Sequence, residues 1–121
     1  MHTKSLSELS RDLRSKAVSS EELTRLFLDR IARYDGTLNS FITTTPELAV
    51  ARAREADRRL RAGEGGALCG IPIAQKDIFC TPGVRTTCGS RMLDNFVPPY
   101  AATTVARFDA AGAVSVGKTN M

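Results

Sequence analysis

"GIPIAQKDIF", residues 70–79, has the pattern of a sheet strand that ends on two charged residues. A glycine opens the stretch, and Ile71 and Ile73 supply the β-branched apolar side chains that strands favour. Lys76 and Asp77 then stand side by side where the strand should end. Lys76 is therefore either a solvated charge at the mouth of a sheet or an amine with a chemical role.

Strand alternation sharpens this question without deciding it. Side chains two apart share a face, so Lys76 lies with Pro72 and Ala74, and Ile71 and Ile73 lie on the other face. If helices cover both faces, the stem of Lys76 has apolar surroundings. An ordinary lysine has a pKa near ~10.4, and a lysine that acts as a base needs that value lowered toward ~7–8. From the spacing alone, the solvated or structural interpretation is preferred.

Helices are expected before this strand. Serine followed three residues later by glutamate occurs at residues 5–8 and 19–22, which is the signature of a capping box. Gly36 is expected to end the second helix, and Pro46 is suited to the first position of a third. The expected elements are helices over 6–16 and 20–36, a strand over 40–45, and a helix from 46 that ends at the glycines 63–66.

After the strand at 71–76, the chain is expected to leave regular structure and then return. Residues 78–100 are rich in glycine and proline, which predicts a long irregular excursion. A helix over 102–111 and a short apolar strand over 113–116, ending at Gly117, follow. The order strand, excursion, helix, strand predicts two parallel strands joined by a crossover, and thus an α/β fold.

The composition is that of an ordinary globular chain. The 121 residues fit one domain or a piece of a larger one, and the net charge is +4. Cys69, Cys80 and Cys88 form no CxxC pair, and His2 is the single histidine, so no metal site is expected. No apolar run approaches the ~20 residues of a membrane span, and the N-terminus lacks the apolar stretch of a signal peptide. A cytoplasmic protein without membrane contact is expected.

One motif invites a nucleotide-binding interpretation. "GAVSVGKT", residues 112–119, fits the phosphate-loop pattern GxxxxGK[ST]. That motif requires a strand before it and a helix after it, whereas here a helix comes before and the intervening residues are strand-like. We therefore expect a buried strand here, no nucleotide binding, and no functional role for Lys118.

Two separated stretches carry a family resemblance. "LCGIPIAQKDIFCTPGVRTTCGSRMLDNF" (68–96) and "AAGAVSVGKTNM" (110–121) together resemble the amidase-signature family. The stretches "SFITTT" and "GKTNM" resemble in particular the branch that forms the glutamine-hydrolysing component of aspartyl/glutamyl-tRNA amidotransferases. The resemblance implies the N-terminal part of the amidase-signature fold, a mixed β-sheet covered by helices with a helical N-terminus. Residues 1–66 would be mainly helical, and residues 67–121 would begin the sheet core of the same domain.

The resemblance also implies roles for single residues. Lys76 matches the lysine of a Ser–cis-Ser–Lys triad, in which it would accept and return protons through a bridging serine while a second serine attacks the glutamine amide. In the family both serines lie further along the chain, in a Gly/Ser-rich segment that these residues do not contain. Residues 1–121 would therefore be inactive by themselves. Asp77 and residues 86–90 are weaker candidates, for shaping the loop beside the site.

The implied activity is glutamine hydrolysis that feeds ammonia to misacylated Glu-tRNA(Gln) or Asp-tRNA(Asn) during translation. The implied partners are amidotransferase subunits B and C, tRNA held through the complex, and glutamine as the small substrate. ATP and Mg²⁺ are expected on the partner subunit, with no cofactor on this chain. The alternatives are a stand-alone amidase of the same family, or a non-catalytic fragment that serves as a binding module.

A last expectation concerns residues 1–121 by themselves. In the family, the strands at 71–76 and 113–117 belong to a larger sheet. Without it, apolar side chains on these strands would be uncovered, and the isolated residues would be loosely folded or aggregated. The side chains in question are Ile71, Ile73, Val114 and Val116.

Overall fold

The computed structural model describes residues 1–121 as helices packed on a small sheet, which confirms the predicted α/β class. Each expected helix and strand is present. The elements are α1 (Leu6–Arg14), α2 (Ser20–Leu38), β1 (Phe41–Thr44), α3 (Pro46–Arg61), β2 (Pro72–Lys76), a 3₁₀ turn η1 (Arg91–Leu93), α4 (Thr103–Ala110) and β3 (Val114–Thr119).

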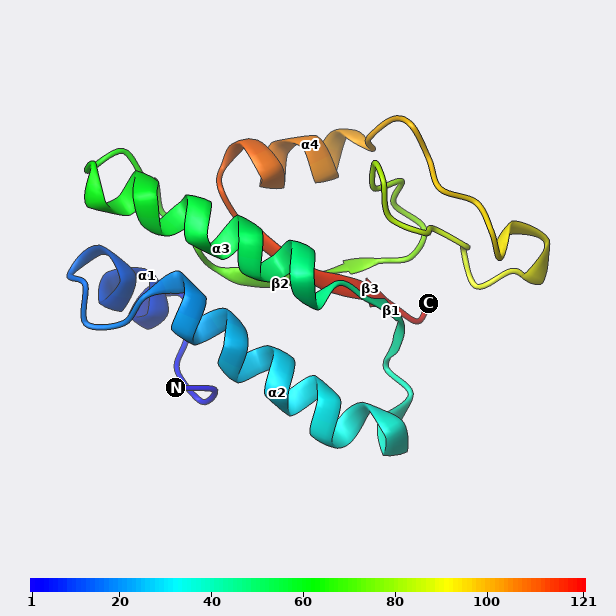
Figure 1. The fold of residues 1–121 in the computed structure, drawn as a ribbon, viewed down its shortest axis with the longest axis horizontal. Helices are drawn as coiled ribbons and strands as arrows, with labels where there is room; N and C mark the ends of the chain where they lie inside the picture. Colours follow the sequence, from blue (N-terminus) through cyan, green and yellow to red (C-terminus); the bar gives the residue numbers. More distant parts are fainter.

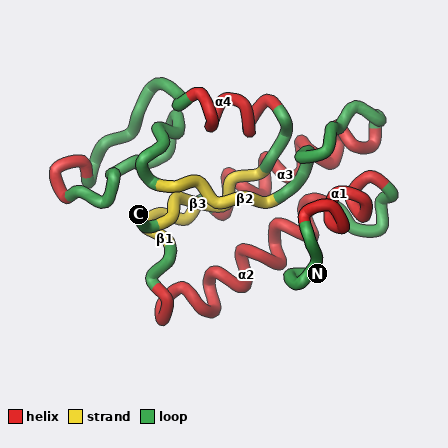
Figure 2. The backbone as a smooth tube through the Cα atoms, turned by 180° about the vertical axis from the view of Figure 1, so that it is seen from behind, coloured by secondary structure: helices red, strands yellow, loops and turns green.

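The sheet has three strands in the order β1-β3-β2, so β3 is the central strand. β3 runs parallel to β2 and antiparallel to β1, which gives the mixed sheet that was expected. The connection from β2 through α4 to β3 is the predicted crossover. In Figures 1 and 2, α2 and α4 lie on opposite sides of the strands, and α3 crosses in front of the sheet in one view and behind it in the other.

The N-terminal helices begin where the capping boxes predicted. The Ser5 and Ser19 hydroxyls each accept a hydrogen bond from the backbone of the glutamate three residues on. The prediction that Gly36 ends α2 is wrong, because the helix continues to Leu38 and is capped by Asn39 in the left-handed conformation, at φ 53°. Asn is one of the few residues that adopt this conformation readily, so Asn39 takes the role expected of glycine.

The hydrophobic core lies between the sheet and the helices α1, α2 and α3. Ile71 is 3% exposed and packs with Leu9, Leu13, Val18 and Leu23. Val114 and Val116 pack against the small alanines of α3, where Ala49 and Ala53 allow a close approach. The expectation that Ile71, Val114 and Val116 would be uncovered is therefore wrong, because helices of the same 121 residues bury them; Ile73 is only partly buried.

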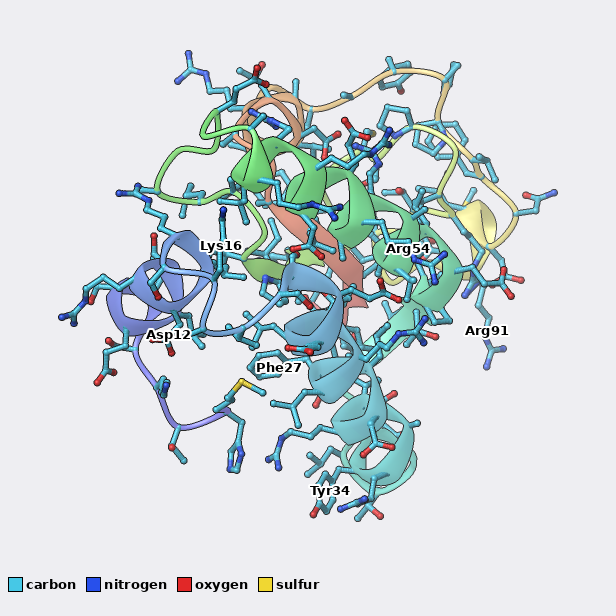
Figure 3. The ribbon with its side chains drawn as sticks, turned by 60° about the vertical axis from the view of Figure 1, so that its left-hand side comes forward. Asp12, Lys16, Phe27, Tyr34, Arg54 and Arg91 are labelled. Carbon is cyan, nitrogen blue, oxygen red and sulfur yellow. The ribbon has the colours of Figure 1, made fainter.

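The surface between α2 and α3 is charged. Arg54 of α3, labelled in Figure 3, donates a hydrogen bond to Glu21 of α2 at 3.0 Å, and Arg25 binds the same carboxylate. These two hydrogen bonds lower the pKa of Glu21, with that from Arg54 contributing most. The arginines of α3 thus include side chains that pair with neighbouring acids, as expected of a solvated helix face.

The segment between β2 and α4 is irregular, as predicted, and contains only the short turn η1. Figure 1 shows it extending beyond the ends of the strands, on the side where the C-terminus lies. Arg91, at its far end, points away from the rest of the chain in Figure 3. None of the helices has the length and apolar character needed to cross a membrane.

Candidate functional site

Lys76 is the last residue of β2, an edge strand, as the sequence predicted. Its backbone is paired with Thr119 of β3, and its carbonyl accepts a hydrogen bond from the Phe79 amide at 3.0 Å. The side chains of Lys76 and Ala74 are exposed, so the face that they share is not covered by the helices of these residues. The fold thus holds the backbone of Lys76 and leaves its amine accessible.

Lys118, for which sequence reasoning predicts no role, is the largest fully buried side chain of the chain. Its Nζ donates to the Phe79 carbonyl at 2.6 Å, to Thr81 Oγ1 at 2.8 Å and to Thr86 Oγ1 at 3.0 Å. An ammonium group has three donors, so these bonds use all of them. Lys118 is therefore bound internally, and the phosphate-loop pattern around it forms strand β3 instead of a loop.

Asp77 is completely buried beside this lysine. Its Oδ1 lies 3.9 Å from Lys118 Nζ and has no hydrogen-bond partner. Its Oδ2 accepts two hydrogen bonds from Thr87, from the hydroxyl at 2.5 Å and from the amide at 3.0 Å. The structure thus brings together Asp77, Lys118 and threonines of the irregular segment in a polar cluster at the end of the sheet.

The charge of Lys118 is set by two opposing effects. Burial lowers the pKa of Lys118, because a charged amine is less stable away from water. The Asp77 carboxylate acts in the opposite direction and offsets part of that effect. The pKa of Lys118 remains below its ordinary value, so burial is the larger of the two.

The other weaker candidates, residues 86–90, are placed in two groups. Thr86 and Thr87 belong to the polar cluster, whereas Ser90 is directed to η1 and accepts a hydrogen bond from the Met92 amide at 3.2 Å. Cys88 and Gly89 both have positive φ, at 53° and 68°, so the chain reverses here. Among the candidates of this loop, Thr86 and Thr87 are therefore the ones whose hydroxyls contact the buried charges.

A β-irregularity explains why sequence alternation does not place Lys118. Ile73 pairs with Ser115 and Gln75 pairs with Lys118, so two steps along β2 match three steps along β3. This extra residue shifts the alternation of β3, which a strict two-residue period starting from Val114 does not predict. The only sequence signal for the cluster is the pair of threonines that follows a lone strand-end aspartate.

A second feature is an apolar groove of about 330 Å³ between α2 and the sheet. Phe27 and Tyr34 of α2, both labelled in Figure 3, line it together with Phe41 and Ile73. Neither Lys76 nor Lys118 lines this groove. The chain contains no group of three or more His, Cys, Asp or Glu side chains placed to hold a metal ion.

Comparison with known proteins places this arrangement in a family. The sequence pattern of the family described as Amidase matches residues 22–121. The chain is 65% identical over its whole length to the A subunit of glutamyl-tRNA(Gln) amidotransferase from Methylococcus capsulatus, and 60% identical to the protein of the same name from Marinobacter nauticus. It spans a quarter of the length of each of these relatives, 25% in both cases.

Solved structures agree with the sequence comparison. The native peptide amidase of Stenotrophomonas maltophilia superposes with a TM-score of 0.92 at 36% identity, over 98% of this chain and 25% of that enzyme. The match includes both strands that carry the two lysines, because it covers nearly the whole chain. The chain therefore belongs to the amidase family, of which it forms a part similar to one quarter of a full-length member.

Proposed function

We propose that these residues form part of the glutamine-hydrolysing A subunit of a tRNA amidotransferase. The observation that carries the proposal is the 65% identity, over every residue of this chain, to a relative that bears this name in its glutamyl-tRNA(Gln) form. The ammonia released from glutamine would be used to convert Glu-tRNA(Gln), or Asp-tRNA(Asn), to the amide form during translation. The chain covers a quarter of that relative, so the activity is assigned to the full-length protein.

In this proposal Lys76 is the proton carrier. Its amine would take a proton through a bridging serine while a second serine attacks the amide carbon of glutamine. The proton would then return to the departing nitrogen, ammonia would leave, and water would release glutamate from the acyl-serine. The exposed amine at the end of an edge strand, on a backbone held by Thr119 and Phe79, supports this role.

The proposal includes an assembly. The relatives are each named as one subunit of an amidotransferase, which implies an enzyme of several subunits. The partners of this chain would be subunits B and C. The tRNA would be bound through the complex, and ATP with Mg²⁺ would be bound by the partner subunit. The reaction would take place in the cytoplasm, where aminoacyl-tRNA is used.

A stand-alone amidase is the second candidate. The observation that favours it is the TM-score of 0.92 to a peptide amidase, because the same local fold occurs there in a protein named for another amide substrate. The two candidates differ in their need for partners. A component of a tRNA amidotransferase requires companions for transamidation, whereas a stand-alone amidase hydrolyses its substrate without them.

The test is release of ammonia from glutamine by the full-length chain, alone and with subunits B and C. Lys76→Ala should abolish this activity and leave the thermal unfolding curve unchanged, because the side chain is exposed within these residues. Lys4→Ala, which removes an exposed lysine that pairs only with Asp12, is the matched control and should keep normal turnover. Near-normal turnover in Lys76→Ala would contradict the assignment of Lys76. A wild-type chain that hydrolyses peptide amides but not glutamine would favour the stand-alone amidase.

A further inference from the structure

The buried cluster of Lys118, Asp77 and Thr87 has no part in the proposed chemistry, and its contacts suggest another purpose. Lysine is rarely buried completely, because its charge must then be paired or bonded. Replacing a buried ion pair with apolar residues often leaves a protein equally stable or more stable, so stability alone does not account for such a pair. The position of its partners is the more informative observation.

All the hydrogen-bond partners of Lys118 Nζ lie in the segment that directly follows Lys76. They are the Phe79 carbonyl, at 2.6 Å, and the hydroxyls of Thr81 and Thr86, at 2.8 and 3.0 Å. Phe79 also donates its amide to the Lys76 carbonyl. The residue three positions after Lys76 is thus bonded to Lys76 at one end and to Lys118 at the other.

Asp77, the immediate neighbour of Lys76, is held through both its backbone and its side chain. Its amide donates to the Thr119 carbonyl at 3.2 Å, and its carbonyl accepts from the Cys88 amide at 3.1 Å. Its carboxylate accepts two hydrogen bonds from Thr87 and faces Lys118. Asp77 therefore fixes the direction in which β2 ends, and with it the point from which the Lys76 side chain departs.

We propose that Lys118 is a positioning residue, which acts through Asp77 and the Phe79 carbonyl to hold the backbone on either side of Lys76 and so to place its amine. The proposal rests on the proposed function in assigning the chemistry to Lys76. It assigns no proton transfer to Lys118, whose three donors are already engaged. Thr87 contributes to the same positioning by holding the Asp77 carboxylate from the opposite side.

The test uses the full-length chain with its partner subunits and compares Lys118→Met with the wild type. Methionine keeps most of the volume of the buried stem and removes the three hydrogen bonds. We expect kcat per folded molecule to fall by about tenfold to 100-fold, as for a small displacement of a reacting group, with KM nearly unchanged. The pH profile of kcat should also move, because the amine of Lys76 would sit in altered surroundings. Lys4→Met is the control at an exposed lysine and should change neither quantity.

A milder pair of variants keeps the test decisive if Lys118→Met does not fold. Thr87→Val keeps the shape of the side chain and removes the hydroxyl that donates to Asp77, whereas Thr87→Ser keeps that hydroxyl. Thr87→Val should lower kcat and move the pH profile in the same direction, and Thr87→Ser should retain the wild-type behaviour. Equal behaviour of the valine and serine variants, with an unmoved pH profile, would overturn the proposal.

A measurement that needs no substrate separates this proposal from the proposed function. The pH dependence of acetylation of Lys76 by acetic anhydride, read by mass spectrometry, should differ between the wild type and Thr87→Val. If glutamine is not hydrolysed but this difference is found, the positioning role stands and the substrate assignment fails. If glutamine is hydrolysed and neither the acetylation nor the kcat profile moves, the positioning role fails and the proposed function stands.

Discussion

The ends of β2 and β3 lie side by side, and each carries a lysine, yet the two side chains have opposite surroundings. Lys76 stands at the end of an edge strand with its amine exposed. Lys118, one position before the Thr119 that pairs with Lys76, is 0% exposed and is bonded to three oxygens. The difference arises from strand order, because the central strand β3 is covered on both sides and the edge strand β2 is not.

This contrast bears on how a lysine is recognised as functional. A buried lysine with a lowered pKa is often taken as a catalytic candidate. Here the buried lysine uses all its donors within the fold, and its bonds fix the backbone around the exposed one. Free donors and access to substrate are therefore better criteria in this chain than burial alone.

The largest effect on stability is expected from Asp77→Ala in the full-length chain. The substitution leaves the Lys118 ammonium buried without the charge that faces it, and removal of one partner of a buried pair typically costs about 3–5 kcal/mol. Asp94→Ala is the matched control, since Asp94 also pairs with a basic residue, Arg85, but its side chain is 75% exposed. The control should change the free energy of unfolding by less than about 1 kcal/mol.

Urea unfolding followed by circular dichroism measures both variants. A loss in Asp77→Ala no larger than in Asp94→Ala would show that the cluster around Lys118 does not hold the end of the sheet, and the contrast between the two strand ends would lose its physical basis.

A smaller effect is expected from Gly117→Ala, which tests the packing of the central strand. An added Cβ would lie 2.5 Å from the Thr43 carbonyl oxygen of β1, so the β1–β3 pairing must shift, at a cost of about 1–3 kcal/mol. Gly36→Ala is the opposite case, because an added Cβ there has no atom within 4 Å and the residue is inside α2. It should stabilise the chain by about 0.5–1 kcal/mol. Thermal unfolding of the two variants should therefore shift in opposite directions, and a shift in the same direction would refute the account of β3.

The smallest effect concerns pH. The pKa of Lys118 is lowered on folding from its ordinary 10.5, so between the two values the unfolded chain binds more protons than the folded chain. Stability contributed by this residue should consequently rise as pH increases toward 10.5. The urea midpoint of the wild type, relative to that of Lys118→Met, should increase between neutral and alkaline pH. A relative decrease would mean that the fold favours the charged form of Lys118.

The helices and strands can be predicted well from the sequence because their signals are local. Capping boxes at Ser5 and Ser19, and the β-branched residues of the strands, depend on residues that lie within a few positions of one another. The predicted stop of α2 at Gly36 is wrong because Asn39, three residues later, provides the left-handed cap, and glycine inside a helix is tolerated at a modest cost.

The polar cluster is not predictable in the same way. It joins Asp77 and Thr87 to Lys118, which follows them by at least 31 positions, and it depends on an irregularity in the pairing of β2 with β3. Sequence alternation gives no information on such an irregularity, so the sequence predicts that the strand ends at Gly117, before Lys118. The strand in fact continues to Thr119, because Gly117 lets β1 pack closely against it.

The most direct test of the central claim compares Lys76→Met and Lys118→Met in the full-length chain, with ammonia release from glutamine and the unfolding midpoint measured on the same samples. The account predicts a crossed result. Lys76→Met should lose turnover almost completely at an unchanged midpoint, and Lys118→Met should unfold at a clearly lower midpoint and keep partial turnover. A Lys76→Met variant with normal turnover, or a Lys118→Met variant with an unchanged midpoint, would contradict the division of roles between the two lysines.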